Sequence, residues 1–144
     1  MHDIYIAAPF FNDEQLEIVE SIKKLLDEDS ISYFSPKDES MFKQGDDPSS
    51  ILDLNCNAID ESQFIIVVTD GKDVGAIWEA GYACGRYVPV VYLWLGYEPG
   101  MKFNIMLAAS GAIAHSYDEL QIQIRCKRDT GEFINNYDDG MLHE

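Results

Sequence analysis

The sequence predicts an α/β fold with a parallel sheet and helices on both faces, and two patterns lead to this prediction. Short, continuously apolar runs such as residues 64–68 are typical of strands buried on both faces. Between these runs, apolar residues recur every three or four positions, as on one face of a helix. Because strand and helix patterns alternate, crossover helices should connect parallel strands. The 144 residues suit a single domain, residues 1–144, with one core.

Five apolar segments are expected to form the strands of this sheet. They are residues 4–8, 31–35, 64–68, 87–95 and 111–114. The fourth of these segments is almost continuously apolar and should be buried on both faces, whereas the last is the weakest. The second is stopped by Pro36, which cannot donate a ladder hydrogen bond.

Helix starts are marked by side chains that can accept hydrogen bonds from free backbone amides. Asn12 and Ser116 are each followed three residues later by Gln or Glu, the spacing of a capping box. Asp47 precedes a proline, which favours an N-cap with Pro at the first helical position. Further helices are expected to begin near Ala76 and at Asn104, and the last helix should run to about residue 125.

Two polar stretches are expected to lie outside regular elements. Residues 37–47 are polar and contain glycine, so they should form a loop long enough to act as a mobile lid. The tail, residues 127–144, is rich in Asp, Gly and Asn. We expect this tail to be ordered by packing at a subunit interface.

Charge and composition exclude several classes of partner. The chain has 26 acidic and 10 basic side chains, and its net charge of −16 should repel nucleic acids and anionic membranes. No apolar run approaches the roughly 20 residues that span a bilayer, and residues 1–4 lack a basic signal-peptide region. Three separated cysteines, Cys56, Cys84 and Cys126, then indicate reduced thiols in a cytoplasmic protein and show no metal-ligand spacing.

The most informative stretch is residues 70–81. Its charged loop leaves the strand 64–68 at the carboxyl end, where open α/β sheets bind ligands. Gly75 is expected to let the backbone turn sharply. Glu79 should then lie in the first helical turn, where the helix dipole would keep its carboxylate ionised. These features predict a nucleophile.

Asp73 lies six residues before Glu79, and the two carboxylates could face one crevice. Such a pair can divide the work of attack from that of binding or proton transfer. The alternative is that Asp73 caps the helix and Glu79 is a solvated acid. Tyr5, on the neighbouring strand, could donate a hydrogen bond to Glu79, and Phe11 could stack on a flat base, with core packing as the alternative for both.

Other residues carry weaker signals. Phe10 and Trp78 are expected in the core, and so is Leu52 on the apolar face of the second long helix. Asn55 is expected on that inward face, so it must find a polar partner, and a ligand is one possibility. The sequence has no Gly-x-Gly-x-x-Gly after the first strand and no P-loop, and its three scattered histidines do not suggest a Ser-His-Asp triad.

Three segments resemble the nucleoside 2-deoxyribosyltransferase family. They are IYIAAPFFNDEQ at residues 4–15, DVGAIWEAGYA at 73–83 and FNIM at 103–106. The central motif, Asp-x-Gly-x-x-x-Glu-x-Gly, is the most specific, and the resemblance covers roughly residues 1 to 121. It implies a flavodoxin-like three-layer fold with a five-stranded parallel sheet.

The resemblance also implies an activity, the exchange of one base for another on 2′-deoxyribose. Glu79 would attack C1′ of a 2′-deoxynucleoside, Tyr5 would orient Glu79, Asp73 would bind the sugar hydroxyls and Phe11 would contact the base. Gly75 and Asn104, which stand within the matching motifs, would contact substrate. The implied partners are 2′-deoxynucleosides and free nucleobases, with no metal or organic cofactor, in a homo-oligomer whose sites a neighbouring chain completes.

The chain departs from the family at two points. Asn55 stands where some members have an Asp that protonates the leaving base, and an amide can only hydrogen-bond that base. Protonation through water, Asp53 or Asp38 is then expected. Residues 109–113 also lack the Asn that members supply across the interface for the 5′-hydroxyl, and Ser110 is the candidate stand-in.

Two other functions stay open on the sequence. One is hydrolysis of a nucleoside or a nucleoside 5′-monophosphate, and the nucleotide version ranks lower because residues 7–12 lack the Ser and Arg of a phosphate pocket. The other is a non-catalytic nucleoside-binding module, which the amide at Asn55 would favour.

Overall fold

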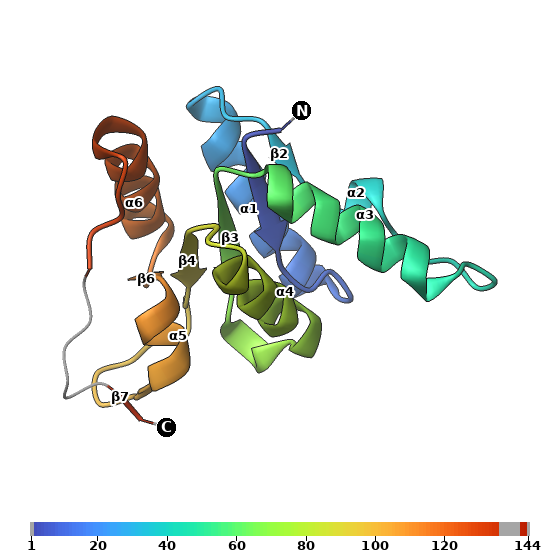
Figure 1. Cartoon of the computed structure of the whole chain (residues 1–144). Helices are drawn as coiled ribbons and strands as arrows, with labels where there is room; N and C mark the ends of the chain where they lie inside the picture. The colour runs from blue at the N-terminus through green and yellow to red at the C-terminus, as the bar shows by residue number, and fades with distance from the viewer. Residues whose placement is uncertain (1, 136–141, 144) are drawn as a thin grey trace.

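A computed structural model describes residues 2–135 and 142–143. Its centre is a five-stranded parallel sheet in the order β2-β1-β3-β4-β6 (Figure 1). The strands are β1 (Ile4–Ala7), β2 (Tyr33–Phe34), β3 (Phe64–Val68), β4 (Val90–Leu93) and β6 (Ala112–Ala114). A small second sheet pairs β5 (Phe103–Asn104) with β7 (Leu142–His143). The predicted α/β fold with a five-stranded parallel sheet is confirmed.

Helices cover both faces of the large sheet. They are α1 (Asp13–Glu28), α2 (Pro36–Glu39), α3 (Pro48–Glu61), α4 (Val74–Gly85), α5 (Ile105–Ser110) and α6 (Tyr117–Thr130), with a 3₁₀ turn η1 at Asp70–Lys72. Buried side chains of α1 and α6 pack on one face, and those of α3, α4 and α5 on the other. The chain therefore forms three layers, and none of its described helices is long and apolar enough to cross a membrane.

Alternation along β1 decides which side chains face the α3–α4 layer. Ile4 and Ile6 are buried in the cluster with α1 and α6, whereas Tyr5 and Ala7 are buried in the opposite cluster. This is the period of two that a strand imposes on its side chains. Tyr5 is thereby aimed at the layer that contains α4.

The predicted helix caps form. The Asn12 Oδ1 atom accepts from the Gln15 amide at 2.9 Å, and Asp47 accepts from the Ser49 amide at 2.9 Å. The Ser116 hydroxyl accepts from the backbone amide three residues later at 3.1 Å. Each cap satisfies an amide that the first helical turn leaves free.

Several predicted boundaries are wrong. Strand β4 begins at Val90 and not at residue 87, because Tyr87 lies in a left-handed turn with φ 60° and is 94% exposed. The last helix continues to Thr130, so residues 127–130 of the expected tail are helical. The tail's predicted interface role falls partly on residues 136–141 and 144, outside the described part of the chain.

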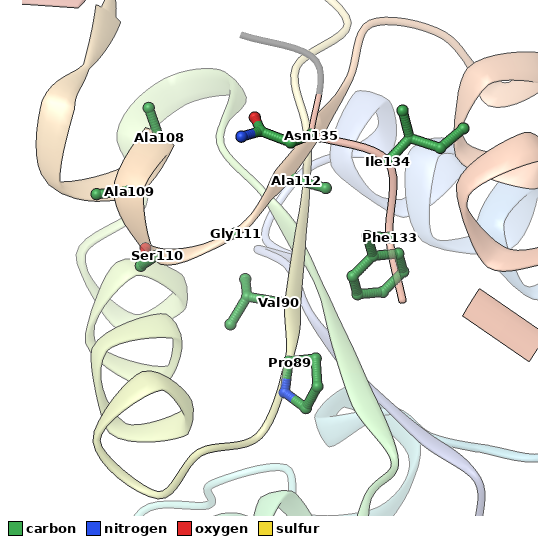
Figure 2. A pocket seen from close by; sticks show the side chains of 10 residues that line it. All are labelled: Pro89, Val90, Ala108, Ala109, Ser110, Gly111, Ala112, Phe133, Ile134 and Asn135. Atoms are coloured by element: carbon green, nitrogen blue, oxygen red, sulfur yellow. The ribbon is translucent and has the colours of Figure 1, made fainter. Parts of the chain in front are cut away.

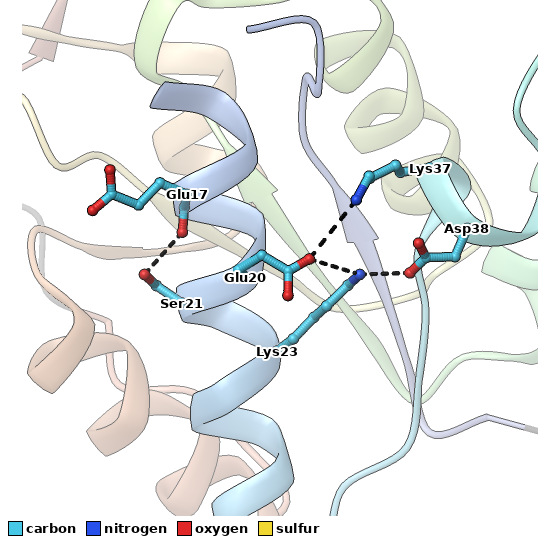
Figure 3. Close-up of polar contacts among 6 residues, drawn as sticks. All are labelled: Glu17, Glu20, Ser21, Lys23, Lys37 and Asp38. Atoms are coloured by element: carbon cyan, nitrogen blue, oxygen red, sulfur yellow. Dashed lines mark hydrogen bonds and ion pairs between the residues drawn. The ribbon is translucent and has the colours of Figure 1, made fainter. Parts of the chain in front are cut away.

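The expected loop 37–47 begins within a short helix, α2, that ion pairs hold against α1 (Figure 3). The Lys23 Nζ atom lies 2.5 Å from Asp38 Oδ2 and 3.2 Å from Glu20 Oε1. Lys23 itself is only 8% exposed. The first part of the predicted lid is therefore attached to the body of the domain.

Two of the residues expected in the core are exposed. Trp78 is 51% exposed and stacks on Tyr82, with ring centroids 5.7 Å apart. Leu52 is 47% exposed on the outer side of α3. Both predictions rested on apolar composition, which does not identify the face of a helix that packs on the sheet.

Candidate active site

Tyr5 and Glu79 form the centre of the candidate site. Tyr5 is fully buried on β1, and its hydroxyl donates a hydrogen bond to Glu79 Oε2 on α4. Strand β1 pairs directly with β3, and α4 follows β3 after η1, so the two side chains meet across neighbouring elements. Phe34 of β2 stacks on Tyr5, with ring centroids 5.4 Å apart and planes 10° apart. The phenol is thus fixed in position before any ligand binds.

The protonation state of Glu79 differs from the sequence prediction. Helix α4 begins at Val74, so Glu79 lies in the second turn and not in the first. Its side chain is half-buried beside the buried residues Ala76 and Ala80. Burial raises the pKa of Glu79 from 4.5 to about 8, because a low-dielectric surrounding disfavours the charged form. The expectation that the helix dipole keeps this carboxylate ionised is therefore wrong for the unliganded chain.

Asp73 caps α4. Its Oδ2 atom accepts from the Ala76 amide at 2.9 Å, which is the structural role considered as the alternative. A carboxylate has further lone pairs, so the cap leaves Asp73 able to accept from a sugar hydroxyl as well.

Gly75 does not make the sharp turn that was predicted for it. It lies inside α4, and an added Cβ would meet only Asp73 Oδ2 at an ordinary 3.4 Å. The turn is made earlier, by Gly71 with φ 78° and Lys72 with φ 51°.

Phe11 lies in the connection between β1 and α1, and Asn55 lies on α3. Phe11 follows β1 and is 74% exposed, with its ring centroid 4.9 Å from that of Phe10. Asn55 is half-buried on α3, and its Oδ1 atom accepts from the Ser40 hydroxyl at 2.5 Å. The exposed phenyl ring has room for a stacked base.

The two acids considered as proton donors are placed differently from Asn55. Asp38 is held in its ion pair with Lys23 on the α1 side of α2 (Figure 3). Asp53 is exposed on α3, two residues from Asn55 and therefore on another side of the helix.

Ser110 does not join Glu79 within one chain. It lies on a pocket of about 320 Å³ between α5, the start of β4 and residues 133–135 (Figure 2). Its hydroxyl lies 2.6 Å from the Tyr92 hydroxyl, and burial raises the pKa of Tyr92. This pocket is at the amino ends of β4 and β6, whereas Asp73 follows the carboxyl end of β3.

Asn104 is the N-cap of α5. Its side chain caps α5 by accepting from the Met106 amide at 2.9 Å. Together with Lys102 and Trp94 it lines a cavity of about 380 Å³ near the carboxyl end of β4. Thr69, Lys72 and Ile77 of the β3–α4 segment line the same cavity, whereas Ser110 lies at the other end of the strands.

Sequence reasoning missed Ser40 and Phe34. Ser40 stands in a polar stretch with no motif, and its pairing with Asn55 depends on how α2 and α3 pack. Phe34 occupies a two-residue strand, and only the order of strands in the sheet brings it against Tyr5.

Comparison with known proteins identifies the family of this chain. The family model described as nucleoside 2-deoxyribosyltransferase matches residues 4–106, a span that includes the Tyr5–Glu79 pair. No curated protein matches the chain.

Solved structures share the fold. A 2-deoxyribosyltransferase from Bacillus psychrosaccharolyticus is 23% identical, with a TM-score of 0.70 over 95% of this chain and 93% of that one. A conserved protein from Enterococcus faecalis is 18% identical, with a TM-score of 0.75 over 88% and 99%. A CMP N-glycosidase from Clostridium botulinum is 15% identical, with a TM-score of 0.60 over 85% and 98%. At these identities the likeness is one of fold, and it is the family match over residues 4–106 that shows that the chain belongs to the nucleoside 2-deoxyribosyltransferase family.

Proposed function

We propose that this protein transfers 2-deoxyribose between nucleobases through a covalent deoxyribosyl intermediate on Glu79. The observation that carries the proposal is the buried Tyr5 hydroxyl bonded to Glu79 Oε2, in a family that acts by deoxyribosyl transfer. A half-buried carboxylate with a fixed hydrogen-bond donor is a suitable nucleophile, because it is poorly solvated and held in one orientation.

The reaction would follow the course of retaining glycoside hydrolysis. As the C1′–N bond breaks, its electron pair goes to the base, and an oxygen of ionised Glu79 forms a bond to C1′. A second base then attacks C1′ and expels the carboxylate, so that two inversions retain the configuration. The incoming base loses one proton, and the departed base gains one.

The neighbouring residues would bind the two parts of the substrate. Asp73 would accept from a sugar hydroxyl with lone pairs that the helix cap does not use. Phe11, which is exposed at the end of β1, would stack on the base. Tyr5 would donate to the carboxylate and favour its ionised form, against the effect of burial.

A neighbouring chain would complete the site. Within one chain, the Ser110 hydroxyl meets Tyr92 in the pocket at the amino ends of β4 and β6, and the Asn104 side chain caps α5. We therefore assign their substrate contacts to a homo-oligomer. A mixed assembly of Glu79→Ala chains and Asn104→Ala chains should regain part of the activity that each variant lacks alone.

Hydrolysis is the second candidate, because the similar Clostridium botulinum structure is a CMP N-glycosidase. Water would then take the place of the second base. Transfer and hydrolysis would therefore share the same covalent intermediate and differ only in whether a second base or water attacks it.

Mass spectrometry of the intact protein, after brief incubation with a 2′-deoxynucleoside, tests the proposal. The wild type should gain one deoxyribosyl group, Glu79→Ala should gain none, and the exposed Glu17→Ala should behave as the wild type. A second free base should then yield an exchanged nucleoside. Release of free deoxyribose in its place would identify a hydrolase, and an unmodified wild type would contradict both functions.

A further inference from the structure

A short hydrogen bond between Ser40 and Asn55 fixes the orientation of a side chain beside the candidate site. Ser40 follows α2 and is 6% exposed, and its hydroxyl lies 2.5 Å from Asn55 Oδ1. In this contact the hydroxyl is the donor and the amide oxygen is the acceptor, at a distance usual for an O–H donor. The alternative acceptor, the Pro36 carbonyl, is 3.4 Å away. The serine therefore donates to the amide carbonyl.

This bond leaves the amide nitrogen of Asn55 as the group available to a ligand. Within residues 2–135 and 142–143, no hydrogen bond is made by Nδ2, and no buried side-chain nitrogen lacks a partner. The Nδ2 group must therefore be open to solvent. An amide held in this way offers two N–H donors and keeps its acceptor occupied.

Asn55 lies on the side of α3 that packs towards the layer of Tyr5 and α4. Asn55 is one turn before Ala58 and Ile59, which share a buried cluster with Tyr5. Helix α2 follows β2, whose Phe34 stacks on Tyr5. These neighbours bring Ser40 and Asn55 towards Glu79, the candidate nucleophile.

Building on the proposed deoxyribosyl transfer, we propose that Ser40 positions Asn55 to donate a hydrogen bond to the departing base, so that the site selects 2′-deoxynucleosides whose base leaves as an anion. An amide N–H stabilises a developing negative charge but delivers no proton. The C1′–N electron pair stays on the base while the Glu79–C1′ bond forms. The anionic base then takes its proton from water.

The nearby acids do not replace the missing proton donor. Asp38 is engaged by Lys23 at 2.5 Å. Asp53 is two positions from Asn55, about 200° around the helix, and is exposed. The rate should therefore follow the acidity of the leaving base. Among pyrimidines of similar shape, 5-fluorouracil is a better anion than uracil, and uracil is better than cytosine.

The test compares kcat/KM for 5-fluoro-2′-deoxyuridine, 2′-deoxyuridine and 2′-deoxycytidine with one acceptor base. The wild type should rank them in that order, with at least about a tenfold step between neighbours. Asn55→Asp introduces a general acid, and since such acids contribute roughly 10²–10⁴-fold, it should raise the rate for 2′-deoxycytidine most and flatten the order. Ser40→Ala frees the amide, so the departing anion loses its fixed donor and the steps between substrates should widen, mainly through kcat. Ser40→Thr, which keeps the hydroxyl, should preserve the steps.

The outcomes separate this inference from the function on which it rests. If the deoxyribosyl adduct forms but Asn55→Asp and Ser40→Ala leave the ratios of kcat/KM between the three substrates unchanged, the role of the Ser40–Asn55 pair is refuted while deoxyribosyl transfer stands. If no adduct forms with any of the three nucleosides, deoxyribosyl transfer itself is refuted. A flattened order in Asn55→Asp, with Ser40→Thr like the wild type, supports the inference.

Discussion

Replacing Glu79 with glutamine should stabilise the folded protein, and the gain should grow with pH. The glutamine has the same shape and can still accept from the Tyr5 hydroxyl. It removes only the cost of ionising a carboxyl group in a half-buried position. The folded chain holds the Glu79 proton more tightly than the unfolded chain does, so raising the pH through this range favours unfolding of the wild type.

The size of the effect follows from the change in pKa on folding. The pKa of Glu79 rises from 4.5 to about 8 in the folded chain, and a tenfold change in a proton-binding constant corresponds to about 1.36 kcal/mol. Linkage then gives a stability gap between variant and wild type that widens by about 2.5 kcal/mol from pH 5 to pH 7. The gap should level off above pH 8, after a total change on the order of 4–5 kcal/mol from strongly acidic conditions.

Urea unfolding at pH 5, 6, 7, 8 and 9 measures this gap directly. The exposed Glu17→Gln removes the same charge from α1 and reports the general effect of net charge on this acidic chain. A gap for Glu79→Gln that stays constant across the series, or that matches the Glu17→Gln series, would refute the reasoning.

Further predictions concern activity and packing. We expect kcat/KM to rise from pH 6 to pH 9 with an apparent pKa near 8, because only ionised Glu79 can attack; a flat profile would contradict this. Tyr5→Phe should move that apparent pKa upward and lower kcat/KM roughly 10–100-fold, since the carboxylate loses its donor. Gly75→Ala should raise the free energy of unfolding by about 0.4–1 kcal/mol, which urea unfolding would measure. Because the family resemblance places Gly75 against the substrate, the folded variant should also have a lower kcat/KM, and an unchanged kcat/KM would contradict that contact. Gly111→Ala should lower the free energy of unfolding by about 1–3 kcal/mol, because its Cβ would clash with the Val90 carbonyl oxygen, and an unchanged urea midpoint would contradict this.

The sequence predicts the strands of the sheet well where a short run is apolar at every position, because such a run is typical of a strand that is buried on both faces. Residues 64–68 are all buried, and β3 has the predicted bounds. The same logic made the fourth strand too long, because Val88 is buried without being part of β4. An apolar run predicts that its residues are buried, but it does not predict that their backbone is extended. Tyr87 has φ 60°, which lies outside the β region, so the strand cannot include it.

The candidate site could be predicted in part, because two of its elements are encoded locally. The motif around Asp73 and Glu79 fixes a helix start and an acid, and pairing of adjacent strands makes a contact with Tyr5 foreseeable. The Ser40–Asn55 contact depends on the packing of α2 against α3, for which the sequence has no local pattern. Long-range packing of this kind is decided by the whole core.

The protonation of Glu79 could not be predicted from its position in the sequence, for a physical reason. A helix dipole is worth about 0.3–1 kcal/mol near the surface and acts within the first turn, whereas the second turn of α4 lies against the sheet. Burial there raises the pKa to about 8, an effect several times larger than the dipole and opposite in sign. A chain with a net charge of −16 could place an acid at many exposed positions at no such cost. The nucleophilic role proposed for Glu79 would account for a carboxyl group at this position, because a poorly solvated carboxylate is the more reactive one.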